Sequence, residues 1–286
     1  MKYLLIALFL SGFAASQTGS PQANANSVPG SPQAKSSQAK SSQAIPVDQQ
    51  NEDKAKAVLN EMIQALGGKA YLEIQDVTQE GRGYSFHLGR PTSAGVIFWR
   101  FYKYPDQERD ELTKKRDIVE VVNGDKGFEI TYKGVHPMDA KDLADYLRRR
   151  EYALDGVLRK WINEPGVAFF YEGSTVADQK PAEQVTIMNA HNQAVTLYMD
   201  SSTHLPLKKS FSWRDPTDQQ RNVEEEIYDN YRPANGIMSP FVVTRYYNGD
   251  MSNQRFLTAI EYNKGLNESL FNVEPGNSSS APASRK

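Results

Sequence analysis

Seven segments between Val167 and Tyr262 have the pattern of consecutive β-strands, and this run limits the possible folds more than any other feature of the chain. Apolar and β-branched residues alternate within them, and turn-forming pairs such as Asp215-Pro216 and Asn235-Gly236 separate them. Short connections predict an antiparallel meander, and a long meander curls because sheets twist. The predicted strands are residues 167–176, 184–189, 194–200, 205–213, 223–231, 237–247 and 254–262.

The stretch before this run predicts a helix followed by further strands. The helix spans residues 54–66 and stops at Gly67-Gly68. Its apolar side consists of Ala55, Val58, Leu59, Met62, Ile63 and Leu66. We expect a strand at 72–84, two strands or one bent strand across 96–112, and a hairpin of residues 118–122 and 127–132 around Asn123-Gly124.

A second and longer helix is predicted over residues 139–161, with Asp139 as its N-cap and Pro165-Gly166 after its end. Its apolar side consists of Leu143, Tyr146, Leu147, Leu154, Val157, Leu158 and Trp161. That side has to be buried against another element. We therefore predict a mainly β (α+β) fold, in which a curled antiparallel sheet forms an open or incomplete β-barrel with helices covering its concave face.

The two ends of the chain lack the patterns of a globular fold. Residues 1–16 resemble a signal peptide, with Lys2 before an apolar run that is too short for a stable transmembrane segment. Residues 17–50, rich in Ser, Gln, Ala and Pro, and residues 277–286 predict a disordered linker and a disordered tail. One domain, residues 51–276, lies between them. The absence of cysteine excludes disulfides and a lipid-modified N-terminal cysteine.

No motif in the chain indicates catalysis, a metal or a cofactor. Its histidines are far apart and lack the spacing that aims two imidazoles at one metal: His87, His136, His191 and His204. Phosphate-binding glycine loops and a nucleophile elbow are absent from the sequence. The formal net charge of −2, with both signs interspersed, argues against nucleic acid as a partner. We predict no catalytic residue, metal or cofactor; a hydrolase that uses paired Asp or Glu residues is the alternative.

The arginine run 148–150 in the long helix has two interpretations. The ordinary one is a solvated surface with weak ion pairs. The other is that Arg148 and Arg149 line a rim that meets a partner or an anionic head group. Arg150 falls near the apolar side, so we expect it to be buried and paired.

Aromatic residues are concentrated in the predicted strands. Most of this content is explained by core packing and cross-strand pairing. A surplus on the concave face would instead form an apolar pocket for an acyl chain. The candidate residues for this hydrophobic cavity are Phe98, Trp99, Phe101, Tyr102, Tyr104, Phe128, Leu143, Leu147, Leu154, Leu158, Trp161, Phe211 and Trp213.

The order of these elements resembles the LolA/LolB-like lipoprotein-carrier family, which includes outer-membrane lipoprotein-sorting proteins. The matching pieces are the first helix, the strand 98–104 running into Pro105, the hairpin 123–128, the segment 200–206, Tyr231 with Asn235-Gly236 and Pro240, and the closing segment 270–276. The resemblance covers residues 54–276. In the family the strand before the proline ends in an arginine important for ligand release, and Tyr104 stands at the matching position here.

The resemblance implies an unclosed antiparallel barrel whose helices cover a hydrophobic cavity, and binding of lipoprotein acyl chains in the periplasm. We expect a divergent relative of this family: a non-enzymatic binding or carrier protein for lipid or lipoprotein acyl chains, soluble in the periplasm after signal cleavage. The alternative is an envelope module on the same fold that binds a protein partner or senses stress. In that case the long helix is ordinary core and there is no lipid cargo.

Overall fold

The strands at the two ends of the folded region, β1 (Asp76–His87) and β14 (Asp250–Tyr262), pair with each other. The computed structural model describes residues 47–92 and 94–273. The other strands are β2 (Arg90–Pro91), β3 (Val96–Lys103), β4 (Gln107–Leu112), β5 (Ile118–Asn123), β6 (Lys126–Thr131), β7 (Gly134–Pro137), β8 (Ala168–Ala177), β9 (Lys180–Met188), β10 (Ala194–Asp200), β11 (Pro206–Arg214), β12 (Arg221–Ala234) and β13 (Ile237–Tyr247). The helices are α1 (Val47–Leu66), α2 (Lys69–Leu72), α3 (Ala140–Glu151) and α4 (Leu154–Arg159), with 3₁₀ turns η1 (Trp161–Asn163) and η2 (Glu268–Leu270).

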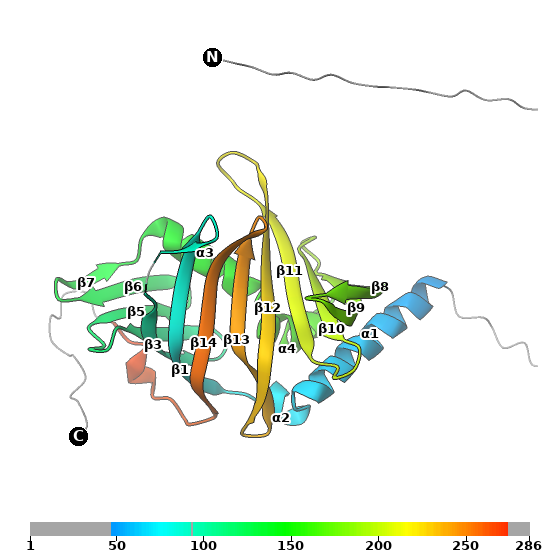
Figure 1. Ribbon diagram of the computed structural model, residues 1–286, viewed down its shortest axis with the longest axis horizontal. Coiled ribbons are helices and arrows are strands. Elements are labelled where there is room, and N and C mark those ends of the chain that lie inside the picture. The colour runs from blue at the N-terminus through cyan, green and yellow to red at the C-terminus, as the bar shows by residue number, and fades with distance from the viewer. Residues whose placement is uncertain (1–46, 93, 274–286) are drawn as a thin grey trace, which may run out of the picture. The chain divides into compact units, whose positions relative to one another are not determined.

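The β1–β14 pair joins two antiparallel meanders into one sheet of order β7-β6-β5-β4-β3-β1-β14-β13-β12-β11-β10-β9-β8, with β2 paired to β1. The sheet is 14-stranded and does not close into a barrel, because β7 and β8 stay at opposite edges. Figure 1 shows α3 and α4 behind strands β1 and β11 to β14. We call the face that carries these helices the inner face. The mainly β, incompletely closed fold predicted from the sequence is confirmed.

Most of the predicted strands are confirmed within a few residues. The seven strands predicted after residue 166 are β8 to β14, and residues 96–112 form the two separate strands β3 and β4. The predicted hairpin is β5 and β6. The strand predicted from residue 72 begins only at Asp76, because residues 69–72 form the short helix α2.

The prediction of one helix over residues 139–161 is wrong, because this segment forms α3, α4 and η1. Asp139 caps α3 as predicted, its carboxylate accepting hydrogen bonds from two amides of the first turn at 2.8 and 3.3 Å. The helix stops before Ala153, whose backbone is extended (φ −63°, ψ 141°). The break lets Tyr152 enter the core, where its ring stacks on Phe211 with a centroid distance of 4.2 Å. A tertiary contact thus overrides the helical periodicity.

Helix α1 supplies one side of the main hydrophobic core. The residues predicted for its apolar side are all buried: Ala55, Val58, Leu59, Met62, Ile63 and Leu66. They form one cluster with buried residues of α4, η1 and β8 to β11, including Trp161 and Ile187. Gly67 ends the helix as predicted, and a Cβ there would lie 2.7 Å from the carbonyl oxygen of Gly236. The contact between α1 and the β12–β13 turn therefore requires glycine.

The predicted terminal segments lie almost entirely outside the described residues. The signal peptide at 1–16 and the tail at 277–286 stay predictions, and so does the linker up to residue 46. Residues 47–50, at the end of the predicted linker, belong to α1. Across residues 47–92 and 94–273, no helix is both long and apolar enough to cross a membrane.

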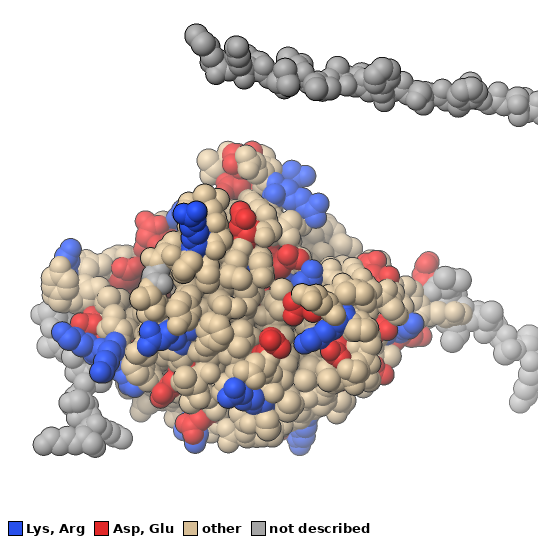
Figure 2. All heavy atoms as spheres, in the orientation of Figure 1, with Lys and Arg blue, Asp and Glu red and all other residues tan. Residues whose placement is uncertain are grey.

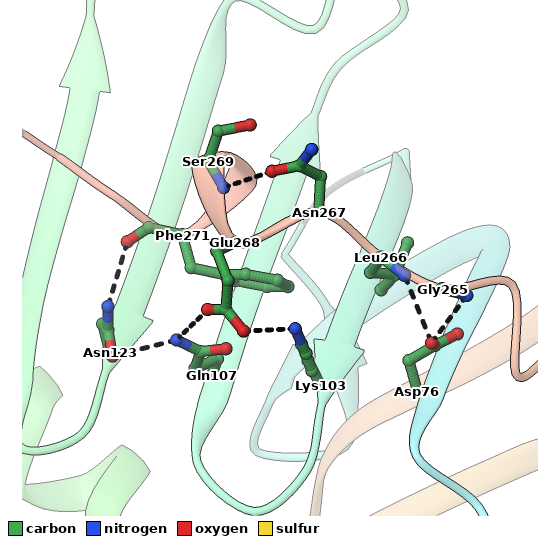
Figure 3. Close-up of polar contacts among 10 residues, drawn as sticks. All are labelled: Asp76, Lys103, Gln107, Asn123, Gly265, Leu266, Asn267, Glu268, Ser269 and Phe271. Atoms are coloured by element: carbon green, nitrogen blue, oxygen red, sulfur yellow. Dashed lines mark hydrogen bonds and ion pairs between the residues drawn. The ribbon is translucent and has the colours of Figure 1, made fainter.

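The chain that leaves β14 is tied to the first residue of β1. Asp76 is 2% exposed, and its carboxylate accepts hydrogen bonds from three successive backbone amides, as Figure 3 shows for the second and third. The donors are Lys264 (2.7 Å), Gly265 (2.9 Å) and Leu266 (3.2 Å). A buried carboxylate bound in this way fixes the direction of the C-terminal segment.

The C-terminal segment then covers the outer face of β3 to β5 (Figure 3). Glu268 pairs with Lys103 and accepts a hydrogen bond from Gln107 at 3.0 Å. Asn123 donates to the carbonyl oxygen of Phe271 at 3.4 Å. The Phe271 side chain is 1% exposed. The C-terminal segment therefore forms a second buried layer with the outer face of these strands, separate from the core that α1 and α4 cover.

We expect Phe271→Ala to lower the free energy of unfolding by about 3 kcal/mol, because it removes a fully buried aromatic ring. Urea denaturation monitored by circular dichroism measures the change. Tyr132→Ala is the matched control, since Tyr132 is 90% exposed. Equal midpoints for the two variants would show that the segment does not stabilise the sheet.

Candidate functional site

A cavity of about 900 Å³ lies between the inner face of the sheet and helices α3 and α4. Strands β1, β3 to β5 and β11 to β14 supply its sheet wall. The hydrophobic core around α1 fills the neighbouring part of the inner face, over β8 to β11. The cavity is of the size typical of small-molecule sites, which is about 300–1,000 Å³.

Much of the cavity wall is aromatic or aliphatic. The aliphatic and tryptophan part includes Leu66, Val77, Val122, Met138, Leu154, Trp161, Ile237, Met238, Val243, Leu257 and Ile260. Seven tyrosines also line it: Tyr71, Tyr102, Tyr104, Tyr146, Tyr228, Tyr231 and Tyr262. Each of their hydroxyls is hydrogen-bonded to another protein group. The tyrosines therefore present their rings to the cavity and keep few free polar atoms for a ligand.

Four charged residues on β11 to β14, which we call the basic row, form one part of the wall: Lys209, Glu226, Arg245 and Arg255. Glu226 is the cross-strand partner of both Lys209 and Arg245, so the three side chains share the inner face. Its carboxylate binds Nζ of Lys209 at 3.0 Å and Nε of Arg245 at 2.7 Å. The row contains three cations and one carboxylate.

The pKa shifts follow from this imbalance. Burial by itself would raise the pKa of Glu226, but Lys209, Arg245 and Arg255 hold it well below its usual range. Burial lowers the pKa of Lys209. Burial and the positive charges of Arg245 and Arg100 lower the pKa of Arg255 to about 9. The carboxylate of Glu226 is therefore ionised, and the excess positive charge of the row is not neutralised within it.

Four residues on β3 to β5, the acidic row, form the opposite part of the sheet wall: Arg100, Glu108, Asp110 and Glu120. The Arg100 guanidinium lies 2.9 Å from Glu108 and 2.7 Å from Asp110. Burial raises the pKa of Glu120 to about 7, and the negative charges of Asp110 and Glu129 add to the effect. Burial also raises the pKa of Glu108, against the attraction of Arg100. This row contains three carboxylates and one cation.

The outer face of the sheet contrasts with these rows. Figure 2 shows that charges of both signs are scattered over it and that uncharged residues predominate. The two rows place eight charged side chains on the inner face, at the wall of a cavity where water is partly excluded. That arrangement is costly unless each charge has a partner.

A third polar group lies at the end of the cavity near α2. Asp155 accepts hydrogen bonds from the hydroxyls of Tyr71 (2.7 Å) and Tyr104. The Arg159 guanidinium lies over the Tyr104 ring, 4.1 Å from its centroid, and donates to the carbonyl oxygen of Ile74. Burial first, and then Asp155, raise the pKa of Tyr104, so its hydroxyl stays a donor. An arginine therefore does lie beside Tyr104, supplied by α4.

The structure brings four of the thirteen predicted cavity residues to the cavity wall: Tyr102, Tyr104, Leu154 and Trp161. Three others belong to the adjoining hydrophobic core: Leu158, Phe211 and Trp213. Phe98 is buried on the inner face of β3, outside the cavity lining. Leu143 and Leu147 of α3 are half-buried and also lie outside the lining.

The remaining three predicted residues point to the outer face. On β3, Arg100 and Tyr102 line the cavity, so alternation directs Trp99 and Phe101 to the opposite side. Phe128 pairs with Val121, which lies between the inward residues Glu120 and Val122. Sequence alternation separates two faces correctly but does not say which one is inner.

Two arginines of the predicted run have structural partners. Arg148 binds Glu224 at 3.0 Å, and its guanidinium lies 3.6 Å from the centroid of the Trp213 ring. Arg150 donates to the backbone carbonyls of Asp106 (3.2 Å) and Gly124 (2.7 Å), which confirms that it is paired. Both hold α3 against the sheet.

Arg149 and Arg255 differ from these arginines. Both border the cavity. Neither makes a hydrogen bond or an ion pair with any residue in the described part of the chain. Burial first, and then the charge of Arg245, lower the pKa of Arg149, as they do that of Arg255.

The two charged rows were not predicted from the sequence, although a signal for them exists. On β11, Phe211 is buried in the main core, and Lys209 occupies the inward position two residues before it, where it is 2% exposed. A lysine at such a position is unfavourable unless it has a partner. Charged residues at inward positions of predicted strands were therefore the informative pattern. Within the described residues, no group of His, Asp and Glu side chains could hold a metal ion.

Glu120 predicts a pH dependence of stability. Because its pKa is raised from 4.5 to about 7, the folded state holds the proton more tightly than the unfolded state. The tighter proton binding contributes to the free energy of unfolding. This stabilising contribution of Glu120 is fully present below pH 4.5 and is lost as the pH rises through 7. We expect Glu120→Gln to be more stable than the wild type by about 2 kcal/mol at pH 8 and similar to it at pH 5.

Denaturation midpoints between pH 5 and pH 8 measure this difference. The control is Glu261→Gln, since Glu261 is exposed on β14. If the Glu120→Gln profile runs parallel to that of the wild type, the residue is not protonated in the folded state.

The comparisons with known proteins support the fold. Searches of protein-family models and of curated proteins find no match. A DUF1329 family protein from Desulfovibrio piger is similar in structure, with a TM-score of 0.55 and 11% identity over 76% of this chain and 97% of that chain. A LolA superfamily protein from Nitrosomonas europaea has a TM-score of 0.47 and 11% identity, over 77% of this chain and 97% of its own.

A domain from Vibrio parahaemolyticus described as an outer membrane lipoprotein-sorting protein has a TM-score of 0.48 and 11% identity, over 76% of this chain and 97% of its own. Similar solved structures thus include a LolA superfamily protein and an outer membrane lipoprotein-sorting domain. At 11% identity, the likeness to the Desulfovibrio piger protein shows the fold alone.

Proposed function

We propose that the chain is a non-enzymatic carrier that binds the acyl chains of lipids or lipoproteins in the bacterial periplasm. The observation that carries this proposal is the cavity of about 900 Å³ under α3 and α4, with its wall of tyrosine rings and aliphatic side chains. The sequence resemblance to the lipoprotein carriers and the signal-peptide pattern of residues 1–16 support it.

The energetics of acyl-chain burial fit such a cavity. Each buried methylene contributes about 0.8 kcal/mol, so a modest apolar length is enough for micromolar binding. The tyrosine hydroxyls are already bonded within the protein, so an acyl chain would not leave them without partners.

We expect Leu257→Trp to weaken binding of a fluorescent fatty acid about tenfold or more. Leu257 lines the cavity, and a larger indole would displace about two methylene groups of the ligand. Phe256→Trp is the matched control, because Phe256 is adjacent to Leu257 on β14, faces the opposite side of the sheet and is 39% exposed. Fluorescence titration measures both affinities.

Mass spectrometry of lipids extracted from the purified chain gives an independent test, and we expect a co-purified acyl lipid. A chain that carries no lipid and does not bind the fatty acid contradicts the proposal. That result, together with a single stoichiometric protein partner, would favour the alternative of an envelope interaction module.

A further inference from the structure

The basic row and Arg149 form a group of four cations around a single carboxylate. Lys209, Arg245 and Arg255 share the single carboxylate of Glu226, and Arg149 adds a fourth cation from α3. Over the whole cavity lining the charges nearly balance, with eight Lys and Arg residues against seven Asp and Glu residues. The excess is therefore local to this part of the wall.

The neighbouring carboxylates are already engaged. Glu224 accepts hydrogen bonds from Arg148 and from the indole nitrogen of Trp213, each at 3.0 Å. Glu108 binds Arg100 and accepts a hydrogen bond from the Tyr146 hydroxyl at 2.8 Å. Glu224 attracts Arg149 and Glu108 attracts Arg255 electrostatically, but neither carboxylate forms an ion pair or hydrogen bond with these arginines in the described part of the chain.

At the other end of the cavity, Arg159 donates from Nη2 to the carbonyl oxygens of Leu72 and Ile74, and its Nε and Nη1 are buried without a hydrogen-bond partner in the described part of the chain. A single carboxylate, Asp155, accompanies this lone cation, whereas four cations gather around Glu226.

The inward side chains change from charged to apolar along two adjacent strands. On β14, Arg255 is followed at the cavity wall by Leu257, Ile260 and Tyr262, and on β13, Arg245 is followed by Val243. The stretch from residue 255 to residue 262 is about 20 Å of strand. A ligand that spans it meets guanidinium groups at one end and apolar side chains over the rest.

We propose that Arg149, Arg245 and Arg255 bind the acidic head group of an anionic amphiphile, a carboxylate or a phosphate, whose apolar part lies along β13 and β14. This proposal rests on the proposed function and names the class of lipid it takes. Guanidinium groups bind carboxylate and phosphate oxygens through paired N–H donors. An anion at this position would give Arg149 and Arg255 the partners that the described residues do not supply. The lowered pKa of both arginines is consistent with their unpaired, partly desolvated state.

Isothermal titration of the full chain with dodecanoate, dodecanol and inorganic phosphate tests the head-group preference. We expect dodecanoate to bind about tenfold or more tightly than dodecanol, because only the carboxylate makes charged hydrogen bonds. Inorganic phosphate alone should bind much more weakly than dodecanoate, since it has no apolar part.

Arg149→Met and Arg255→Met test the residues. Each should weaken dodecanoate binding about tenfold and leave dodecanol binding unchanged. Arg255→Lys should weaken dodecanoate binding less than Arg255→Met, because it keeps the charge but loses the paired N–H donors. Arg221→Met is the matched control, since Arg221 is exposed at the start of β12 and lies outside the cavity lining.

Thermal denaturation separates a binding role from a structural one. Arg149→Met and Arg255→Met should not lower the melting temperature of the free chain, because neither arginine has a protein partner to lose. A lower melting temperature together with unchanged dodecanoate binding would assign these arginines to the fold and overturn the proposal.

The titrations also distinguish this inference from the proposed function. Equal affinities for dodecanoate and dodecanol would overturn the head-group site while lipid binding stands. Binding of neither would overturn both. If phosphate binds as tightly as dodecanoate and the binding depends on the arginines, the site takes a free anion. That result would overturn the proposal that the ligand is an amphiphile.

Discussion

The pairing of β1 with β14 is the interaction on which the rest of the structure depends. It joins strands from opposite ends of the folded chain and so places the acidic row of β3 to β5 and the basic row of β11 to β14 around one cavity. The two strands approach closely at Gly81, where a Cβ would lie 2.3 Å from the carbonyl oxygen of Phe256. The register shift between Glu80 and Gly81 accommodates this approach.

The inner face of the sheet is divided between a filled hydrophobic core and an unfilled cavity. Over β8 to β11, side chains from α1, α4 and η1 fill the space, and large residues such as Met62 and Trp161 are almost fully buried. Helix α3, in contrast, has no buried residue. The cavity lies beneath it, on strands β12 to β14 and β3 to β5. The filled part and the covered outer layer around Phe271 supply the apolar burial that permits an unfilled region elsewhere.

The cavity combines satisfied and unsatisfied polar groups in a way that suits an amphiphile. The hydroxyls of the lining tyrosines and the buried Glu226 all have partners, so most of the wall does not need water. Arg149 and Arg255 make no hydrogen bond or ion pair with the described residues, and Nε and Nη1 of Arg159 are also without a partner. A group of cations that outnumber their carboxylates beside an apolar wall favours an anionic ligand over a neutral one.

The sequence by itself determined the strands, their turns, the first helix and the cap at Asp139, because local alternation, turn chemistry and side-chain capping set these features. The sequence was also enough to predict Tyr102, Tyr104, Leu154 and Trp161 as cavity residues. Only the tertiary structure decided that Tyr152 leaves the helix to stack on Phe211, and that Phe128 faces outward. The charged rows likewise depend on the register between strands that are distant in sequence, because alternation defines two faces of a strand while packing selects the inner one.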